Sequence, residues 1–229
     1  MAQFNFLEIG KIDYKTCWDY QEELLSKIVN RKRETGVPSP DNYFLLVEHP
    51  PVYTLGKSGN PDNLLIQEEF LRKIGAAFYR IDRGGDITFH GPEQMVGYPI
   101  LDLEFYHLGV REYISKMEEA ILMTIAEFGI EGGRKESATG VWLDPSHPSA
   151  ARKICAIGVR VSRYVTMHGF ALNVNTDLKY FDYINPCGFT SMAVTSLQKE
   201  LGHPVDMDQV KQILKQKFDA EFYSPLANG

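Results

Sequence analysis

Hydrophobic residues follow two different periods along the chain, and together these periods predict a mixture of helices and strands. Apolar residues recur every three to four positions over 13–36 and 110–129, which predicts two long amphipathic helices. Asp13 can cap the first helix, and the segment GVPSP at 36–40 ends it. Shorter helices are predicted over 67–75 and, near the C-terminus, in TSLQKELGH and DMDQVKQILKQKFDAEFY.

Compact apolar runs, rich in β-branched and aromatic residues, predict the strands. They lie at 43–56, with a proline pair in the middle, and at 76–82, 95–103, 153–163 and 165–175, the last two joined by a tight turn. Strands and helices follow one another without a regular β–α–β alternation. The sequence therefore predicts an α+β fold, with the whole chain, 1–229, forming one domain rather than a doubly wound parallel sheet.

Composition and charge narrow the classes of function. The 229 residues carry a net charge of −6, which disfavours a nucleic-acid binder. No apolar run is long enough to predict a membrane span, and the first residues lack the pattern of a targeting peptide. The cysteines, Cys17, Cys155 and Cys187, are few and scattered, so we expect free thiols and a reducing, cytoplasmic location. The dispersed histidines have no metal-ligand spacing, so no metal site is predicted.

A glycine-rich segment, RGGDITFHGPEQ at 83–94, is the first candidate for a binding site. Gly84 and Gly85 would let backbone N–H groups approach a ligand closely, with Arg83 and His90 on either side. Paired glycines are common in turns, so the segment taken alone is better explained as an ordinary glycine turn that exposes an arginine.

Lys153 opens an otherwise apolar strand, KICAIGVR, and faces either solvent or a pocket. On a regular strand Cys155 shares a face with Lys153, so it competes with Cys187 as a reactive thiol. Its apolar neighbours favour packing instead, because apolar burial raises a thiol pKa. Cys17 lies on the apolar stripe of the first predicted helix, so we expect it in the core.

Two further segments contain residues with two interpretations. In TMHGFALN, His168 is expected to be a structural histidine with satisfied hydrogen bonds, and Gly169 to mark a bulge or the close approach of a ligand. In YINPCGF, Pro186 and Gly188 flank Cys187, so the turn could present a nucleophile or hold a buried thiol. The tripeptide alone does not decide between these two.

Taken together, EHPPVYTLG, RGGDITFHGPEQMVGYPILDL, KICAIGVRVSRYVTMHGFALNVNTDLKYFDYINPCG and the following TSL resemble the lipoyl(octanoyl) transferase family of lipoate biosynthesis. The resemblance implies a central mixed β-sheet flanked by helices, as in lipoate– and biotin–protein ligases. It implies that Cys187 carries the acyl group and that Lys153 is its catalytic partner. The implied substrate-binding residues are Arg83, Gly84, Gly85, Asp86, Ile87, Thr88, Phe89, His90, Ala156, Ile157, Gly158, Gly169, Phe170 and Ala171.

The activity implied by this resemblance is transfer of an octanoyl group through a cysteine thioester, without a cofactor. The donor is octanoyl-acyl carrier protein, and the acceptors are lipoyl domains of 2-oxoacid dehydrogenases and the glycine cleavage H protein. Because such partners are acidic, a basic patch is expected around the cleft, from Arg83, Lys153, Arg160 and Arg163. One departure is Glu93, where the family usually has glycine.

Two alternatives remain open at this point. An ATP-dependent lipoate–protein ligase would have the same fold but would need no nucleophilic cysteine. A non-enzymatic binder of acylated carrier proteins or lipoyl domains would keep the pocket without the chemistry.

Overall fold

The computed structural model describes residues 4–136, 138–185 and 193–222. The helices are α1 (Tyr14–Thr35), α2 (Glu68–Lys73), α3 (Val110–Ala126), α4 (Leu197–Leu201) and α5 (Met207–Glu221), with short 3-10 turns η1 (Pro61–Asn63) and η2 (Leu178–Tyr183). The strands are β1 (Asn5–Lys11), β2 (Tyr43–Glu48), β3 (Val52–Leu55), β4 (Ala77–Arg80), β5 (Ile87–His90), β6 (Gln94–Ile100), β7 (Gly140–Leu143), β8 (Arg152–Ser162), β9 (Val165–Asn173) and β10 (Ala193–Val194).

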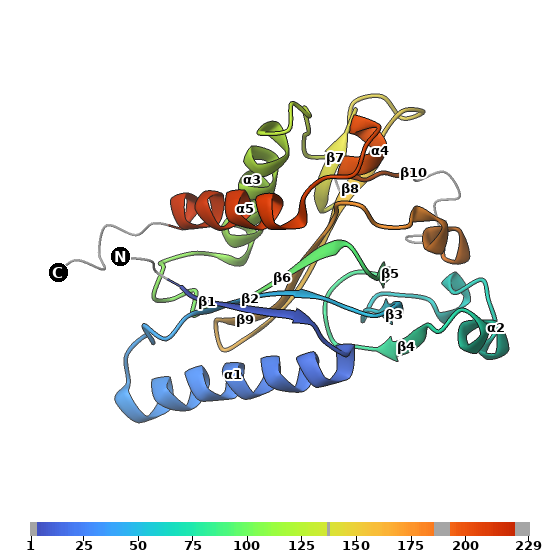
Figure 1. Ribbon diagram of the computed structural model, residues 1–229. Helices are drawn as coiled ribbons and strands as arrows, with labels where there is room; N and C mark the ends of the chain where they lie inside the picture. Colours follow the sequence, from blue (N-terminus) through green and yellow to red (C-terminus); the bar gives the residue numbers. More distant parts are fainter. Residues whose placement is uncertain (1–3, 137, 186–192, 223–229) are drawn as a thin grey trace.

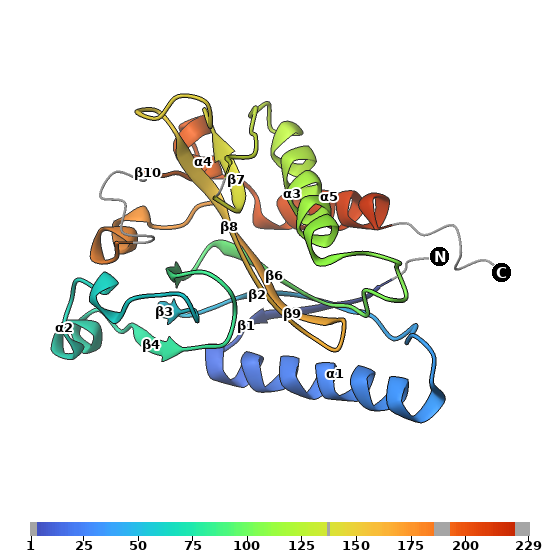
Figure 2. The same ribbon diagram turned by 180° about the vertical axis from the view of Figure 1, so that it is seen from behind.

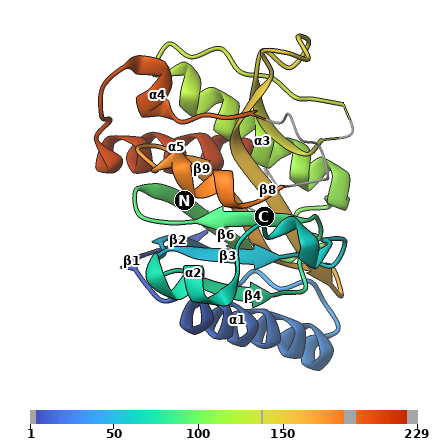
Figure 3. The same cartoon turned by 90° about the vertical axis from the view of Figure 1, so that its right-hand side faces the viewer.

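The strands form a large mixed sheet and a small one. In the large sheet the order is β1-β2-β6-β9-β8-β10, and β7 pairs with β8. β1 with β2 and β10 with β8 are parallel pairs, whereas the other pairs are antiparallel. The small sheet, β4-β3-β5, lies with α2 at one end of the molecule, in front of the large sheet in Figure 3. The predicted α+β fold with a central mixed sheet is confirmed.

Helices cover both faces of the large sheet (Figures 1 and 2). α1 packs against one face, where Cys17, Ile28 and Met167 belong to the same buried cluster. α3 and α5 pack against the other face, where the rings of Phe44 and Phe218 lie 4.6 Å apart. Cys17 is fully buried and burial raises its thiol pKa to about 12, so the predicted packing role is confirmed. Within the described parts of the chain, none of the helices combines the length and apolar character needed to cross a bilayer.

The predicted boundaries of α1 follow from its caps. The Asp13 carboxylate accepts the N–H of Thr16 at 3.0 Å, which satisfies one of the free donors of the first turn. Gly36 ends the helix in the left-handed region with φ of 71°, a conformation that costs glycine little. The β8–β9 hairpin is also confirmed, with Arg163 and Tyr164 in its turn.

Four short strands were not predicted. β1, β7 and β10 fall in segments to which the pattern assigned no element, and β5 lies inside the glycine-rich segment, which we expected to be a loop. β5 forms because residues 87–90 pair antiparallel with β3, a partner more than thirty positions away in the sequence. Such strands depend on partners elsewhere in the chain and leave little local signal.

Gly169 allows β6 and β9 to approach each other closely. A Cβ atom at this position would lie 2.2 Å from the carbonyl oxygen of Gly97, a backbone atom of the neighbouring strand. The group that approaches Gly169 is therefore backbone of the sheet itself, and the expected close approach of a ligand stays a prediction.

Replacing Gly169 with alanine should lower the free energy of unfolding by about 1–3 kcal/mol or prevent folding, because neither strand can move without breaking the sheet. Gly84→Ala is the matched control: its Cβ would meet only the Val159 carbonyl oxygen, at 3.5 Å, so we expect a change below about 1 kcal/mol. Urea denaturation followed by circular dichroism measures both. Equal stability of the G169A and wild-type proteins would show that the close approach is not a constraint.

Candidate active site

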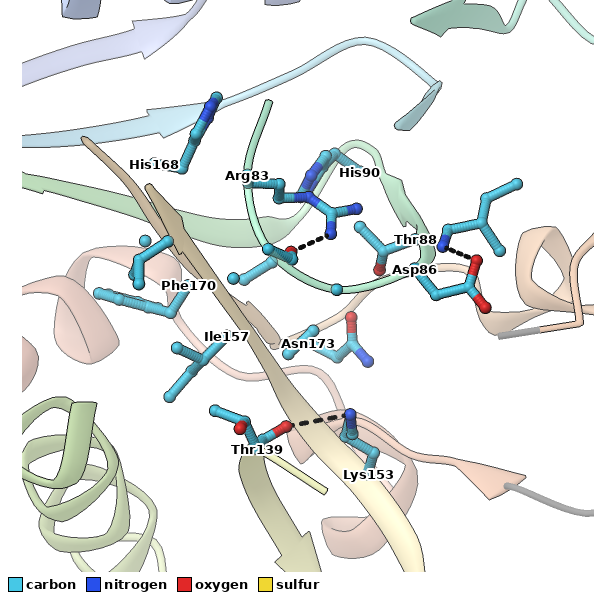
Figure 4. Close-up of a pocket in the computed structure, with 18 of the residues that line it drawn as sticks. Arg83, Asp86, Thr88, His90, Thr139, Lys153, Ile157, His168, Phe170 and Asn173 are labelled. Atoms are coloured by element: carbon cyan, nitrogen blue, oxygen red, sulfur yellow. Dashed lines mark hydrogen bonds between the residues drawn. The ribbon is translucent and has the colours of Figure 1, made fainter. Parts of the chain in front are cut away.

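A cavity of about 530 Å³ lies between the large sheet, the small sheet and η2. Its wall combines the segment from Arg83 to His90 with parts of β8 and β9, as Figure 4 shows. All the predicted substrate-binding residues line it except Phe89. The Phe89 ring turns instead into the apolar cluster of the small sheet, where it stacks on Tyr180 with centroids 4.6 Å apart. Its expected place on the wall was wrong, because neighbouring side chains of β5 point in different directions.

Arg83 shapes the cavity wall from a buried position. Only 7% of the residue is exposed, and its Nη2 donates to both the carbonyl and the hydroxyl oxygen of Thr54. Its Nη1 donates to the carbonyl of Gly84 (Figure 4). Since a Cβ on Gly158 would lie 3.0 Å from the Arg83 Cδ, glycine leaves the room for this side chain.

The predicted basic patch is wrong in its composition. Arg83 is buried, and Arg160 forms ion pairs with Asp82 and Glu22, which compensate its charge. Arg163 lies in the β8–β9 turn, at the opposite end of β8 from Lys153. Of the four residues expected in the patch, only Lys153 and Arg83 line the cavity.

Lys153 reaches the cavity because β8 contains one extra residue. Val141 pairs with Cys155 and the next residue of β7, Trp142, pairs with Lys153, so Ile154 is the extra residue of a β-bulge. The extra residue places the side chains on either side of it, those of Lys153 and Cys155, in different directions. Lys153 lines the cavity, and its Nζ donates to the Thr139 carbonyl at 3.2 Å (Figure 4).

Cys155 does not share the face of Lys153, so that expectation, made for a regular strand, was wrong. The thiol is fully buried in the core under α3 and is not part of the cavity wall. Burial raises the pKa of the Cys155 thiol far above its ordinary value, because no water reaches the charged form. The competing thiol is therefore a packing residue, as its apolar neighbours indicated.

Cys187, Pro186 and Gly188 lie outside the described residues. Ile184, two positions before residues 186–192, and Ala193, directly after them, both line the cavity. Just after it, Val194 of β10 pairs with Lys153 of β8 in parallel register.

A chain of buried hydrogen bonds crosses the sheet beside the cavity. His90 Nδ1 bonds to Gln94 Oε1 at 3.0 Å, and Gln94 Nε2 donates to Asn173 Oδ1 at 2.9 Å. Asn173 Nδ2 then donates to the carbonyl of Thr195, whose own N–H donates to the carbonyl of Lys153. Because Gln94 uses its oxygen toward His90, Nδ1 of His90 carries the hydrogen. The chain fixes the strands that carry the wall relative to Lys153.

His168 is part of the wall as well as a structural residue. Its side chain is buried, its Nε2 bonds to Asp82 Oδ1 at 3.0 Å, and its backbone N–H donates to Gln21. The expected satisfied histidine is correct for Nε2, whereas Nδ1 has no hydrogen-bond partner among the described residues. With φ of 58° within β9, the residue holds a left-handed conformation that costs free energy for a non-glycine residue.

Several wall residues come from segments without a local signal. Tyr14 lies in the first predicted helix, to which no site residue was assigned, yet its ring stacks on His90 and lines the cavity. Tyr98, Trp142 and Asn173 were not predicted at all, and each is brought to the cavity by strand pairing.

Glu93, which replaces the family's usual glycine, keeps the backbone conformation that glycine favours. Its φ is 58°, its N–H donates to the Glu48 carboxylate at 2.8 Å, and its carbonyl accepts the N–H of Asn175. Its side chain is exposed and is not part of the cavity wall. Hydrogen bonds of the backbone therefore hold the loop in this shape without glycine.

The fold is that of enzymes that attach lipoate or biotin to proteins. A bi-partite lipoate protein ligase from Thermoplasma acidophilum superposes with a TM-score of 0.68 at 13% identity, covering 96% of this chain and 84% of that chain. A biotin protein ligase from Aquifex aeolicus superposes at 0.52 and 12% identity, covering 95% and 70%. The model of the family described as "Lipoyl protein ligase A/B catalytic domain" matches residues 13–219, and the chain belongs to this family.

Closer relatives carry a more specific name. A protein named "Octanoyltransferase" from Flavobacterium johnsoniae is 58% identical over 210 residues, which cover 89% of this chain and 90% of that relative. Another of that name, from Parabacteroides distasonis, is 52% identical over 218 residues and covers 95% and 98%. In the part of the chain that the structure describes, no group of three or more His, Cys, Asp or Glu side chains could hold a metal ion.

The three buried histidines make stability depend on pH. Burial lowers the pKa of His49, His90 and His168 below the ordinary value of 6.5, so each histidine binds a proton less readily in the folded chain than in the unfolded chain. As the pH falls through 6.5 the unfolded chain takes up more protons than the folded chain, so the free energy of unfolding falls with pH. Each histidine contributes at most about 1.4 kcal/mol per pH unit to this slope.

Urea denaturation between pH 7.5 and 5.5 measures this slope. The variant His203→Gln, at an exposed position, should leave the slope unchanged. A free energy of unfolding that stays constant across this range would contradict the prediction.

Proposed function

We propose that the protein is an octanoyltransferase whose whole chain acts as one catalytic domain. It transfers the octanoyl group of octanoyl-acyl carrier protein to a lysine of lipoyl domains, those of 2-oxoacid dehydrogenases and the glycine cleavage H protein. The observation that carries the proposal is identity of 52% and 58% to relatives named "Octanoyltransferase", over nearly the full length of both chains. The reaction takes place in the cytoplasm, since a free thiol requires a reducing environment.

The reaction has two steps, both at the sulfur of Cys187. In the first, the thiolate attacks the thioester carbonyl carbon, a cysteinyl thioester forms, and the carrier protein leaves as a thiol. In the second, the amine of the acceptor lysine attacks the same carbon, an amide forms, and the Cys187 thiolate leaves. The first step exchanges one thioester for another and the second is downhill, so the donor's own activation drives the transfer without ATP.

Lys153 assists both steps from the cavity wall. A charged ammonium favours the thiolate, whose ordinary pKa near 8.5 leaves only a few per cent ionised at neutral pH. Once Cys187 is acylated, the negative charge is gone and Lys153 loses its proton more readily. It then accepts the proton of the incoming amine, acting as acid in one step and base in the other.

The octanoyl chain occupies the cavity. Ile87, Ile157 and Phe170 supply apolar wall, and the close approach of Gly97 and Gly169 keeps the sheet beneath it compact. Burying about six methylenes contributes roughly 5 kcal/mol of binding free energy at ~0.8 kcal/mol each. Backbone N–H groups of the segment that carries Gly84 and Gly85 are candidates to stabilise the tetrahedral oxyanion.

The two alternatives are less well supported. An ATP-dependent lipoate ligase shares the fold, but the solved ligases match at 15% identity or less, which concerns the fold alone. A non-enzymatic binder does not account for a lysine brought to the cavity by a dedicated bulge. A pyrophosphate-release assay with free lipoate separates a ligase from a transferase.

Replacing Lys153 with alanine should slow both steps about 100-fold or more, because the thiolate loses its cation and the amine its base. Rapid-quench measurements follow Cys187 acylation by octanoyl-carrier protein and, separately, octanoyl transfer from the acylated protein to a lipoyl domain. Lys135→Ala is the matched control. The ammonium groups of Lys135 and Lys153 both lie near the ring of Trp142, but Lys135 is not part of the cavity wall. Wild-type rates in the K153A variant would refute the assigned role.

Shortening the donor chain should weaken recognition. A hexanoyl donor lacks two methylenes, worth about 1.6 kcal/mol, so its kcat/KM should be about 15-fold lower than that of the octanoyl donor. Steady-state transfer with both donors measures the ratio. Equal values would mean that the cavity does not take up the acyl chain.

A further inference from the structure

The indole ring of Trp142 is fixed beside Lys153 by the backbone around it. Trp142 is fully buried on β7, and its Nε1 donates to the carbonyl of Ala138 at 2.8 Å. Its own backbone N–H and carbonyl exchange two hydrogen bonds with Gly133. The ring therefore has one orientation, set before any ligand arrives.

Lys153 lies against this ring. Its Nζ is 4.7 Å from the centroid of the indole and 3.2 Å from the carbonyl oxygen of Thr139. The electron-rich face of an indole attracts an ammonium ion at such a distance, and a carbonyl oxygen accepts a hydrogen bond from it. The attraction depends on the charge, so it is largely lost when the amine is neutral.

We infer that Trp142 is a positioning residue of the proposed transferase: its indole holds the Lys153 ammonium at the cavity and stabilises the charged form of the amine. The inference rests on the proposed function, because this stabilisation affects catalysis only where Lys153 assists a thiolate.

Other charged groups act on the same amine. Lys135 Nζ lies 5.7 Å from the centroid of the Trp142 indole, so its positive charge disfavours a second positive charge on Lys153. From α3, Glu118 accepts the N–H of Gly140 and pairs with Arg134, so its charge is partly compensated. On β8 itself, Arg152 precedes Lys153 and forms ion pairs with Asp144 and Glu200, which compensate its charge, and Cys155 is a buried thiol whose pKa is raised by burial. The indole and the Thr139 carbonyl therefore favour the ammonium against Lys135.

The two half-reactions respond differently when the attraction between the Trp142 ring and the Lys153 ammonium is weakened. Acylation needs the ammonium to sustain the Cys187 thiolate, so it slows when the charged form is less stable. Transfer to the acceptor needs the neutral amine as base, so it does not slow. A merely structural defect at Trp142 would slow both.

Fluorination tests this without changing the shape of the side chain. The chain has two tryptophans, Trp18 and Trp142. In a Trp18→Phe background, which removes an indole N–H that has no hydrogen-bond partner among the described residues, fluorinated tryptophans label Trp142 alone. Each added fluorine withdraws charge from the ring face and weakens its attraction for a cation.

We expect the acylation rate at pH 7 to fall stepwise with fluorination, by about tenfold for tetrafluorotryptophan, which corresponds to about 1.4 kcal/mol. The pH midpoint of acylation should move upward, while transfer from pre-acylated protein stays within about twofold. Lys135→Gln, which removes the competing charge, should not lower the acylation rate.

Two results would overturn the inference while leaving the proposed function intact. One is acylation of Cys187 at the same rate across the fluorinated series; the other is an equal loss in both half-reactions, as a folding defect would give. If the unsubstituted protein fails to acylate at Cys187, the proposed function and the inference fail together.

Discussion

One extra residue in β8 decides which side chains of that strand reach the cavity. Ile154 has no pairing partner on β7, so the Lys153 side chain points into the cavity while the Cys155 side chain lies in the core. In a regular strand the two would share a face. Without the bulge, either the charged amine would enter the apolar core or the packing thiol would face the cavity. The proposed chemistry of Lys153 depends on this local irregularity of the sheet.

The cavity is stable because its walls are connected across both sheets. Arg83 binds Thr54 of the small sheet, and Asp82, just before it, pairs with His168 and Arg160 of the large sheet. A chain of amides and a histidine continues from β5 to β10. These polar groups are costly to bury, and their mutual hydrogen bonds offset that cost. The arrangement is therefore rigid before substrate binds, as positioning of a thioester requires.

The sequence predicted those features whose signals are local. The two long helices, the cap at Asp13 and the β8–β9 hairpin follow from periodicity and capping, whereas most of the wall from Arg83 to His90 was predicted from the family resemblance. The bulge at Ile154 was not predictable, because it arises from pairing with β7, a strand that the pattern did not show. Tyr14 and Asn173 lie in predicted elements and Trp142 in an unpredicted strand, and all three were missed at the site because only the fold brings them together. The basic patch failed because net charge does not reveal which arginines are buried or paired.

The central claim is that one thiol of this chain carries the acyl group and that it is not the core thiol beside Lys153. Intact-protein mass spectrometry after incubation with octanoyl-carrier protein, followed by peptide mapping, tests it directly. The account predicts a mass gain of a single octanoyl group, on the peptide that contains Cys187. A gain on the peptide with Cys155, or no gain in a protein that still transfers octanoyl groups, would contradict it.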